Sequence, residues 1–310
     1  MGRPRRWLVL LGRTVNSWSE DNAFRLSAAL AYYAVFAIAP VLIIAIAVAG
    51  AVFGRQAARG QIIAQLADLI GRAGAEAISD LLSTARGSGL LNTASVAGFV
   101  TVFIGATGVF AALQDGLNTI WRVKAKSKNL VWVIVRQRIY TFLLVLGLGA
   151  LLFGSLVASA ALSALGEVAG GRQGPPWFWQ AINTLASFVV VFLLFGLVYK
   201  LMPDVYVAWR DVTAGAALAA ALFTAGKVAI GLYLGHSSWT SIYGAAGTLV
   251  LVLAWVYYSS LILFFGAEFT RVHAAFYGRA IVPKPHAELM TATESVEQGL
   301  EPRAPHQLKE

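Results

Sequence analysis

Lys227 places a basic side chain inside a long apolar stretch, residues 212–234. An ammonium group is costly in hydrocarbon, so its presence there indicates a functional role, such as binding an anionic substrate or a lipid phosphate. The alternative is that the long side chain carries its charge to the end of the stretch, about 10 Å away at 1.5 Å per residue. Both interpretations stay open. Lys227 is therefore a candidate for a substrate or lipid path, at a different depth from Glu268, so we expect no direct pair between them.

The first apolar stretch, residues 26–53, adds Pro40, Tyr32 and Tyr33 to this candidate path. Proline has no N–H to donate, so Pro40 predicts a kink or a break in the middle of a helix. Broken helices in transporters expose backbone groups at a binding site near the membrane centre. A kink with only a structural role is the competing interpretation.

Charged and polar residues gather where apolar stretches end on one side. Asp115, Asn118 and Arg122 have the spacing of neighbours on one helical face, and so do Glu268 and Arg271. They predict either a structural network of ion pairs that locks helix ends, or an inner gate whose pairs break and re-form. The whole candidate set is Asp115, Asn118, Arg122, Asp211, Glu268 and Arg271, with Asp204 and Arg210 nearby.

Histidines and carboxylates show no catalytic pattern. A hydrolytic metal centre needs clustered ligands, and the histidines at positions 236, 273, 286 and 306 do not pair at ligand spacing. Neither a phosphate-binding glycine loop followed by lysine nor a G-x-S-x-G motif is present. The absence of cysteine excludes thiolate chemistry. We predict no catalytic residue, no metal and no cofactor, and a protein that is not an enzyme.

Apolar composition determines the fold class. Hydrophobic residues make up 58% of the chain and charged residues 13%, against about a quarter charged in soluble domains. A spanning helix needs about 20 mostly apolar residues. The sequence predicts an all-α polytopic membrane helix bundle with six transmembrane helices, at residues 26–53, 94–113, 139–165, 177–199, 212–234 and 247–269.

Basic residues predict the orientation. Of the 24 Lys and Arg residues, 18 lie on the side that carries both termini, which predicts an N-in/C-in topology. The net charge of +9 indicates contact with the lipid bilayer and its anionic phospholipids. A nucleic-acid partner is disfavoured, because the basic residues lie where topology alone would put them. The richness in Ala, Gly and Arg fits a multi-pass protein of the bacterial plasma (inner) membrane.

Three segments flank or interrupt the spans of the 26–275 transmembrane domain. Residues 1–25 form a cytoplasmic interfacial segment, whose helical face opposite the arginines is apolar. The first outer connection, 54–93, has amphipathic patterns that predict one or two helices, resting on the membrane or forming a lid. Residues 276–310 are rich in Pro and Glu, which predicts a disordered tail. The apolar face of the first segment consists of Trp7, Leu8, Leu11, Val15 and Trp18.

Five segments occur in a fixed order along the chain: Ser27–Pro40 (SAALAYYAVFAIAP), Gln114–Trp121 (QDGLNTIW), Leu201–Asp204 (LMPD), Trp209–Gly215 (WRDVTAG) and Gly266–Phe269 (GAEF). In this combination they resemble the YihY/virulence factor BrkB family of bacterial inner-membrane proteins, formerly labelled ribonuclease BN. The resemblance covers about residues 10 to 275 and implies six transmembrane helices with both ends inside. It implies no settled activity, since members have been suggested to act in export or in envelope integrity.

Two functions of different classes are therefore expected. The first is a transporter or flippase-like permease for an anionic or amphipathic molecule, with Lys227 near the path. The second is a non-transporting envelope-integrity scaffold that binds lipids or partner proteins. A homo-oligomer and an envelope protein partner both stay open, whereas intrinsic ribonuclease activity is disfavoured by the scattered histidines.

Overall fold

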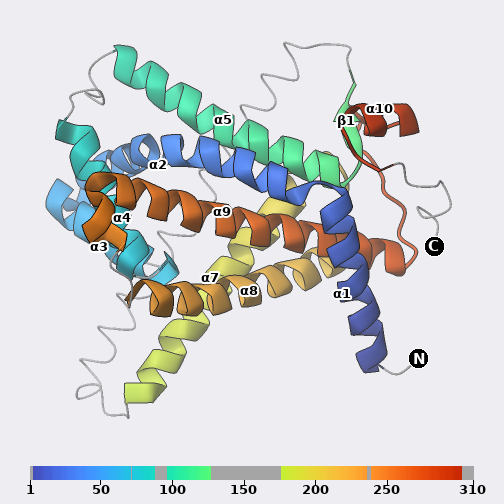
Figure 1. Cartoon of the computed structure of the whole chain (residues 1–310), viewed down its shortest axis with the longest axis horizontal. Coiled ribbons are helices and arrows are strands. Elements are labelled where there is room, and N and C mark those ends of the chain that lie inside the picture. The colour runs from blue at the N-terminus through green and yellow to red at the C-terminus, as the bar shows by residue number, and fades with distance from the viewer. Residues whose placement is uncertain (1–2, 71, 88–95, 127–175, 236–238, 302–310) are drawn as a thin grey trace.

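The computed structural model describes residues 3–70, 72–87, 96–126, 176–235 and 239–301. Within these ranges the chain is mostly helical, with one two-stranded antiparallel sheet (Figure 1). The helices of the bundle are α2 (Ala23–Phe53), α5 (Val96–Ile120), α7 (Pro176–Leu201), α8 (Trp209–Gly235) and α9 (Trp239–Phe276).

Five of the six predicted spans coincide with these helices, and the third, 139–165, lies outside the described residues. In the described part of the chain, α7, α8 and α9 contain apolar windows of 18, 21 and 28 residues with mean hydropathies of 2.2, 1.5 and 2.1. Those lengths suffice to cross the hydrocarbon core of a bilayer. The fold is thus an all-α bundle with at least three helices able to span a membrane.

Helix α2 continues without interruption through Pro40. A proline removes one backbone hydrogen bond, while the residues around it keep theirs, so the helix does not have to end. The break that the sequence allowed at Pro40 is therefore not formed, and no transporter-like broken helix arises at this point.

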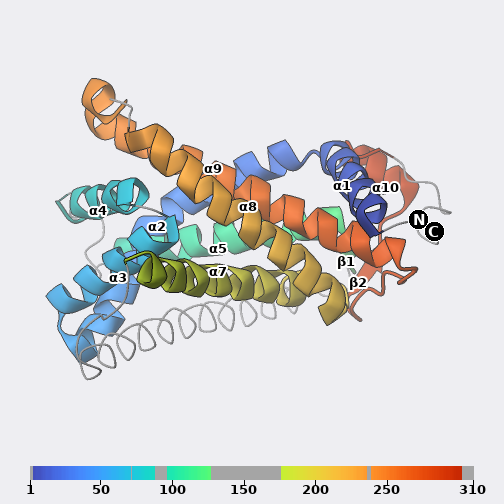
Figure 2. The same cartoon turned by 90° about the horizontal axis from the view of Figure 1, so that it is seen from below.

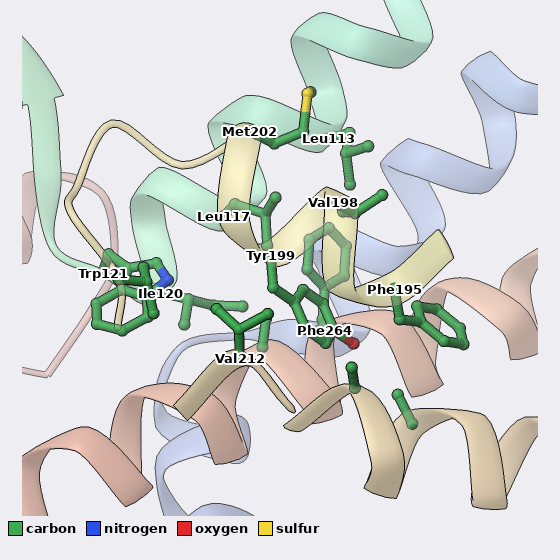
Figure 3. Packing of buried hydrophobic residues seen from close by; sticks show 14 of the residues in the cluster. Leu113, Leu117, Ile120, Trp121, Phe195, Val198, Tyr199, Met202, Val212 and Phe264 are labelled. Carbon is green, nitrogen blue, oxygen red and sulfur yellow. The ribbon is translucent and has the colours of Figure 1, made fainter. Parts of the chain in front are cut away.

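The main core lies between α5, α7, α8 and α9, around the fully buried side chains of Tyr199 and Phe264 (Figure 3). Small residues let α8 and α9 approach closely. A Cβ atom at Gly215 would lie 2.6 Å from the carbonyl oxygen of Gly266 and would overlap Thr270. The bundle is thus held together by interlocked apolar side chains and by direct backbone contact.

The first connection forms two helices, α3 (Arg55–Ile70) and α4 (Arg72–Gly87), in agreement with the predicted amphipathic helices. Ile78 and Leu82 of α4 pack with Ile46 of α2 and Val252 of α9 in a second apolar cluster. Both helices lie at one end of the bundle, which we call the far end (Figures 1 and 2).

The opposite end, which we call the terminal end, carries the first and last described elements of the chain (Figures 1 and 2). Helix α1 (Arg3–Glu20) crosses this end at a steep angle to α2 and α9. Strand β1 (Val123–Ala125) pairs with β2 (Ala287–Leu289), and α10 (Ala292–Glu297) follows.

Order in residues 276–301 corrects the prediction of a disordered tail for that segment. We call residues 281–300 the C-terminal strap. The strap is held by the β1–β2 pairing and by a capping box between Thr291 and Glu294 at the start of α10. Strands of three residues have no detectable apolar period, which is why the sequence pattern missed them. Residues 302–310 lie outside the described part.

Candidate functional site

In the part of the chain that the structure describes, six charged side chains are buried, and all lie at the terminal end of the bundle. Moving a charge out of water costs several kcal/mol unless it is paired and hydrogen-bonded. Each of these groups has an oppositely charged or hydrogen-bonding partner, and together they form three networks. The buried residues are Asp21, Arg122, Asp204, Asp211, Glu268 and Arg271.

The first network joins the α1–α2 turn, the end of α5 and α9. Asp21 pairs with Arg122, and Glu268 pairs with Arg271, whose Nε lies 3.1 Å from Glu268 Oε1. Arg271 also interacts electrostatically with Asp21, which links the two pairs. We call these four residues the buried quartet. Two acids and two arginines neutralise each other's charge in a site that little water reaches.

Two backbone positions in the left-handed region shape this quartet. Asn22 has φ 51° and Arg122 has φ 52°, values that are uncommon for residues other than glycine. Asn22 forms the tight turn between α1 and α2, next to Asp21. Arg122 leaves the helical path after α5 and turns its side chain to Asp21. Non-glycine residues held in this way often occur at functional sites.

The second network is centred on Asp211 in the first turn of α8. Its Oδ1 lies 2.7 Å from Nδ1 of His273 and also accepts a hydrogen bond from Arg279. An acidic side chain at a helix N-terminus also interacts favourably with the helix dipole. This network fixes the start of α8 against the end of α9.

The third network is centred on Asp204, between α7 and α8. Its carboxylate accepts hydrogen bonds from Gln114 Nε2 at 3.1 Å and Asn118 Nδ2 at 2.9 Å, and Nε2 of His286 lies 2.8 Å from it. In return, the backbone N–H of Asp204 donates to Asn118 Oδ1 at 2.9 Å. The backbone N–H of Lys284 donates to the Asp204 carbonyl. One carboxylate therefore connects α5, the α7–α8 connection and the C-terminal strap.

The C-terminal strap also contacts α2 and β1. Asn22 and Arg25 donate hydrogen bonds to the carbonyls of Gly299 and Gln298, at 2.8 and 3.1 Å. Lys124 pairs with Glu294, and with Glu288 at 3.3 Å. The strap thus ties together the ends of helices that are far apart in the sequence.

The Lys124–Glu294 pair perturbs both side chains. The hydrogen bond from Lys124, followed by that from the backbone N–H of Thr291, lowers the pKa of Glu294 from 4.5 to about 2. The hydrogen bond with Glu294 raises the pKa of Lys124 above its ordinary value of 10.5. Both groups therefore stay charged over a wide pH range.

Five of the six residues predicted for the gate or structural network lie in these networks: Asn118, Arg122, Asp211, Glu268 and Arg271. They are divided among three centres rather than forming one. Asp115 is exposed on α5, where Arg25 interacts with its charge, and Arg210 is exposed as well.

Residues predicted for a path are not gathered in the same way. Tyr32 and Tyr33 are exposed on α2, with ring centroids 5.6 Å apart. Lys227 is partly buried in α8, and its neighbour Gly226 faces Tyr258 of α9. Tyr258 precedes Glu268 by ten residues, about 15 Å along the helix, so Lys227 lies at a different depth from the quartet.

Sequence reasoning missed several members of the site. Asp21 lies in the predicted interfacial segment, Gln114 directly after the second predicted span, and Lys124 in the connection that follows it. His273 follows the last predicted span, and Arg279, His286 and Glu294 fall in the predicted disordered tail. In the described ranges, no group of three or more His, Asp or Glu side chains is arranged to hold a metal ion.

The family model described as virulence factor BrkB matches residues 14–290 of this chain. The chain belongs to this family. The matched region contains all residues of the buried quartet and of the networks around Asp204 and Asp211. The C-terminal strap beyond β2, including α10, lies outside the match.

Curated relatives of this BrkB-family chain are UPF0761 membrane proteins. That of Stenotrophomonas maltophilia is 29% identical over 284 residues, which cover 88% of this chain and 63% of the relative. That of Pseudoalteromonas translucida is 26% identical over 269 residues, covering 86% and 85%. The chain thus spans less than two thirds of the Stenotrophomonas protein. No solved structure matches the chain. The protein is an integral membrane protein of the BrkB family.

Proposed function

We propose that this membrane protein is a permease or flippase-like transporter for an anionic or amphipathic molecule, and that the networks at the terminal end form its gate. The carrying observation is that the buried charged side chains of the described residues all lie at one end of the bundle and pair there. Replacing buried ion pairs by well-packed apolar residues is often neutral or stabilising, so stability alone does not account for them. A gate that opens and closes accounts for these buried ion pairs.

Position also favours a gate. The quartet joins the α1–α2 turn, the turn after α5, and α9, and the Asp204 network joins α5, the α7–α8 connection and the strap. These are the elements that must separate if this end of the bundle opens. Because the networks lie at a helix end, water can solvate each charge once its pair breaks. Separation is therefore less costly here than it would be at the centre of the membrane.

The proposal includes the orientation. The terminal end is assigned to the cytoplasm of a bacterial inner-membrane protein with six spanning helices and both termini inside. Two observations support this assignment: α1 and α10 lie at the same end (Figure 1), and 18 of the 24 basic residues fall on the side assigned to the termini. Lys227 then lies on the outer side of the quartet, where it meets the anionic group of the substrate.

Transport can be measured with an anionic, amphipathic probe. Purified protein is reconstituted in liposomes containing fluorescent NBD-labelled phosphatidylglycerol, and dithionite is added outside to reduce the label. We expect protein-dependent movement of the probe between leaflets, lost in Lys227→Gln and kept in Lys126→Gln, which changes an exposed lysine. Movement no faster than in protein-free liposomes, with neither this lipid nor carboxyfluorescein transported, would reject the proposal.

A designed disulfide tests the gate separately. Ala125 and Ala287 are directly opposite in the β1–β2 pair, at a position without hydrogen bonds between them, where Cα atoms are about 4.5 Å apart. The chain has no cysteine, so Ala125→Cys with Ala287→Cys introduces a single cross-link. We expect oxidation to stop probe movement and reduction to restore it. Full movement in the oxidised protein would show that the strap does not take part in gating.

A non-transporting envelope scaffold is the second candidate, and the ordered C-terminal strap favours it, because a fixed terminal end suits a binding surface. In that case probe movement is absent, and cross-linking in cells captures a second copy or an envelope protein. Enzymatic activity is not part of either proposal, because the histidines near the networks each face a single carboxylate.

A further inference from the structure

Helix α1 has an apolar stripe that the rest of the described chain does not cover. Trp7, Leu8 and Val15 are 52%, 70% and 51% exposed. At 100° per residue these side chains lie on one side of the helix, together with the partly buried Leu11. An exposed apolar stripe of this kind needs a partner that is itself apolar or amphipathic.

A different face of α1 attaches the helix to the bundle. Leu10 is buried with Phe269 and Val272 of α9. Thr14 is fully buried one turn later, and its hydroxyl donates to the carbonyl of Leu10. The buried face and the apolar stripe are therefore adjacent but separate, and α1 is held firmly while its stripe stays accessible.

Aromatic contacts place one edge of the stripe next to α9. The ring of Trp7 stacks near Phe269 at 6.0 Å, and that of Trp18 meets Phe265 at 5.9 Å. Both phenylalanines precede Val272 in α9, so they lie nearer the middle of the bundle than Val272 does. Helix α1 crosses the bundle end (Figures 1 and 2), and the Trp7 edge of its stripe therefore lies beside the bundle rather than beyond its end.

Basic residues complete the surface. Helix α1 contains four arginines, at positions 3, 5, 6 and 13, and one acidic residue, Glu20. Arg6 and Arg13 are exposed, on the side of the helix away from the stripe. A helix with an apolar face and a basic face suits the boundary between acyl chains and headgroups, and the arginines attract anionic phosphates.

We infer that α1 is a docking surface for anionic phospholipids. Trp7, Leu8 and Val15 insert at the level of the glycerol and upper acyl chain, and Arg6 and Arg13 bind the headgroup phosphates. This inference does not depend on transport, because a scaffold and a permease would both use such a helix to fix the terminal end at the membrane surface.

Site-directed fluorescence tests the position of the stripe, since the chain has no cysteine to remove. Val15→Cys and, as a matched control, Asn16→Cys are labelled with NBD in full-length protein in nanodiscs. Both positions are exposed and adjacent in sequence, but they point about 100° apart. We expect the label at position 15 to be quenched by lipids with a nitroxide on the upper acyl chain, and the label at position 16 to be quenched by aqueous iodide.

Each other outcome contradicts the inference. Iodide quenching at both positions would mean that the stripe faces water. A shielded label that neither quencher reaches would mean that a second copy or another protein covers the stripe. Quenching by lipid at both positions would mean that the helix is immersed rather than interfacial.

Headgroup preference is measured independently by native mass spectrometry of the purified protein with added phosphatidylglycerol or phosphatidylcholine. We expect preferential binding of phosphatidylglycerol, weakened about tenfold in Arg6→Gln with Arg13→Gln. The control is Lys126→Gln, which removes an exposed charge away from α1. Equal binding of the two lipids, or unchanged binding in the double variant, would overturn the anionic specificity.

Discussion

Helices α8 and α9 pack together along their length, but the two halves of this pair are stabilised in different ways. Toward the terminal end, Asp211 of α8 pairs with His273 of α9 and with Arg279 just after it, and Glu268 pairs with Arg271 within α9. Toward the far end, the contact is aromatic: the ring of Phe223 meets that of Trp255 at 5.8 Å. The same two helices thus combine a charged end with an apolar middle.

The difference follows from access to water. Near a helix end, a charged side chain that loses its partner can be solvated after a small movement, so ion pairs can serve as reversible contacts. In the apolar middle, an unpaired charge has no such alternative, and packing must provide the stability. Lys227 lies in the apolar half, so a variant without its charge tests that half of the pair. The comparison predicts that removing a charge lowers the free energy of unfolding near the terminal end, and leaves it unchanged or raises it in the apolar half.

The largest effect is expected in the buried quartet. Glu268→Gln removes the charge that compensates Arg271, and breaking a buried pair in this way costs about 3–5 kcal/mol. The free energy of unfolding of purified protein in nanodiscs measures the loss. Glu268→Leu combined with Arg271→Met removes both charges and should regain most of the stability. If Glu268→Gln is as stable as the wild type, the quartet does not hold the terminal end.

A smaller loss is expected where α8 and α9 touch. Gly215→Ala places a Cβ atom against the Thr270 side chain and against the Gly266 carbonyl, which cannot move without shifting the α9 backbone, so we expect a cost of about 1–3 kcal/mol. Gly226→Ala is the matched control. Its Cβ would overlap the hydroxyl and the outer ring atoms of Tyr258, a partly buried side chain whose far end can turn aside without moving backbone. Equal losses of thermal stability in the two variants would contradict this account of the close approach.

Apolar length alone was sufficient to predict α2, α5, α7, α8 and α9, because a membrane helix needs only a long apolar run. The strap was not predictable in this way, since its three-residue strands are held by backbone bonds to β1. Helical spacing correctly grouped Glu268 with Arg271, which share α9. It failed for Asp115 and Arg122, because α5 ends at Ile120 and Arg122 then turns out of the helix. Helical spacing applies only within one helix, and the sequence did not show where α5 ends.

The local attachment of the strap is expected to depend on pH. The pKa of Glu294 is lowered from 4.5 to about 2. The contribution of Glu294 to holding the strap on β1 is therefore complete above about pH 4.5 and is lost as the pH falls toward 2. Polarisation of a bimane label at Thr293→Cys should stay constant from pH 7 to 4.5 and fall below it. With Glu294→Gln added, it should be low already at pH 7. A profile that is the same in both proteins would assign the transition to another group.

The smallest structural effect is expected for Lys227→Met, in the apolar half. Methionine matches the length of the lysine stem and removes the cost of an ammonium group in hydrocarbon, so we expect the free energy of unfolding to stay within about 1 kcal/mol of the wild type or to rise. Movement of labelled phosphatidylglycerol should nevertheless be lost. Glu268→Gln with Arg271 unchanged is the contrasting variant, because it should lower stability first. A Lys227→Met protein that is strongly destabilised would show that this charge is structural, and the two halves of the α8–α9 pair would then depend on charge in the same way.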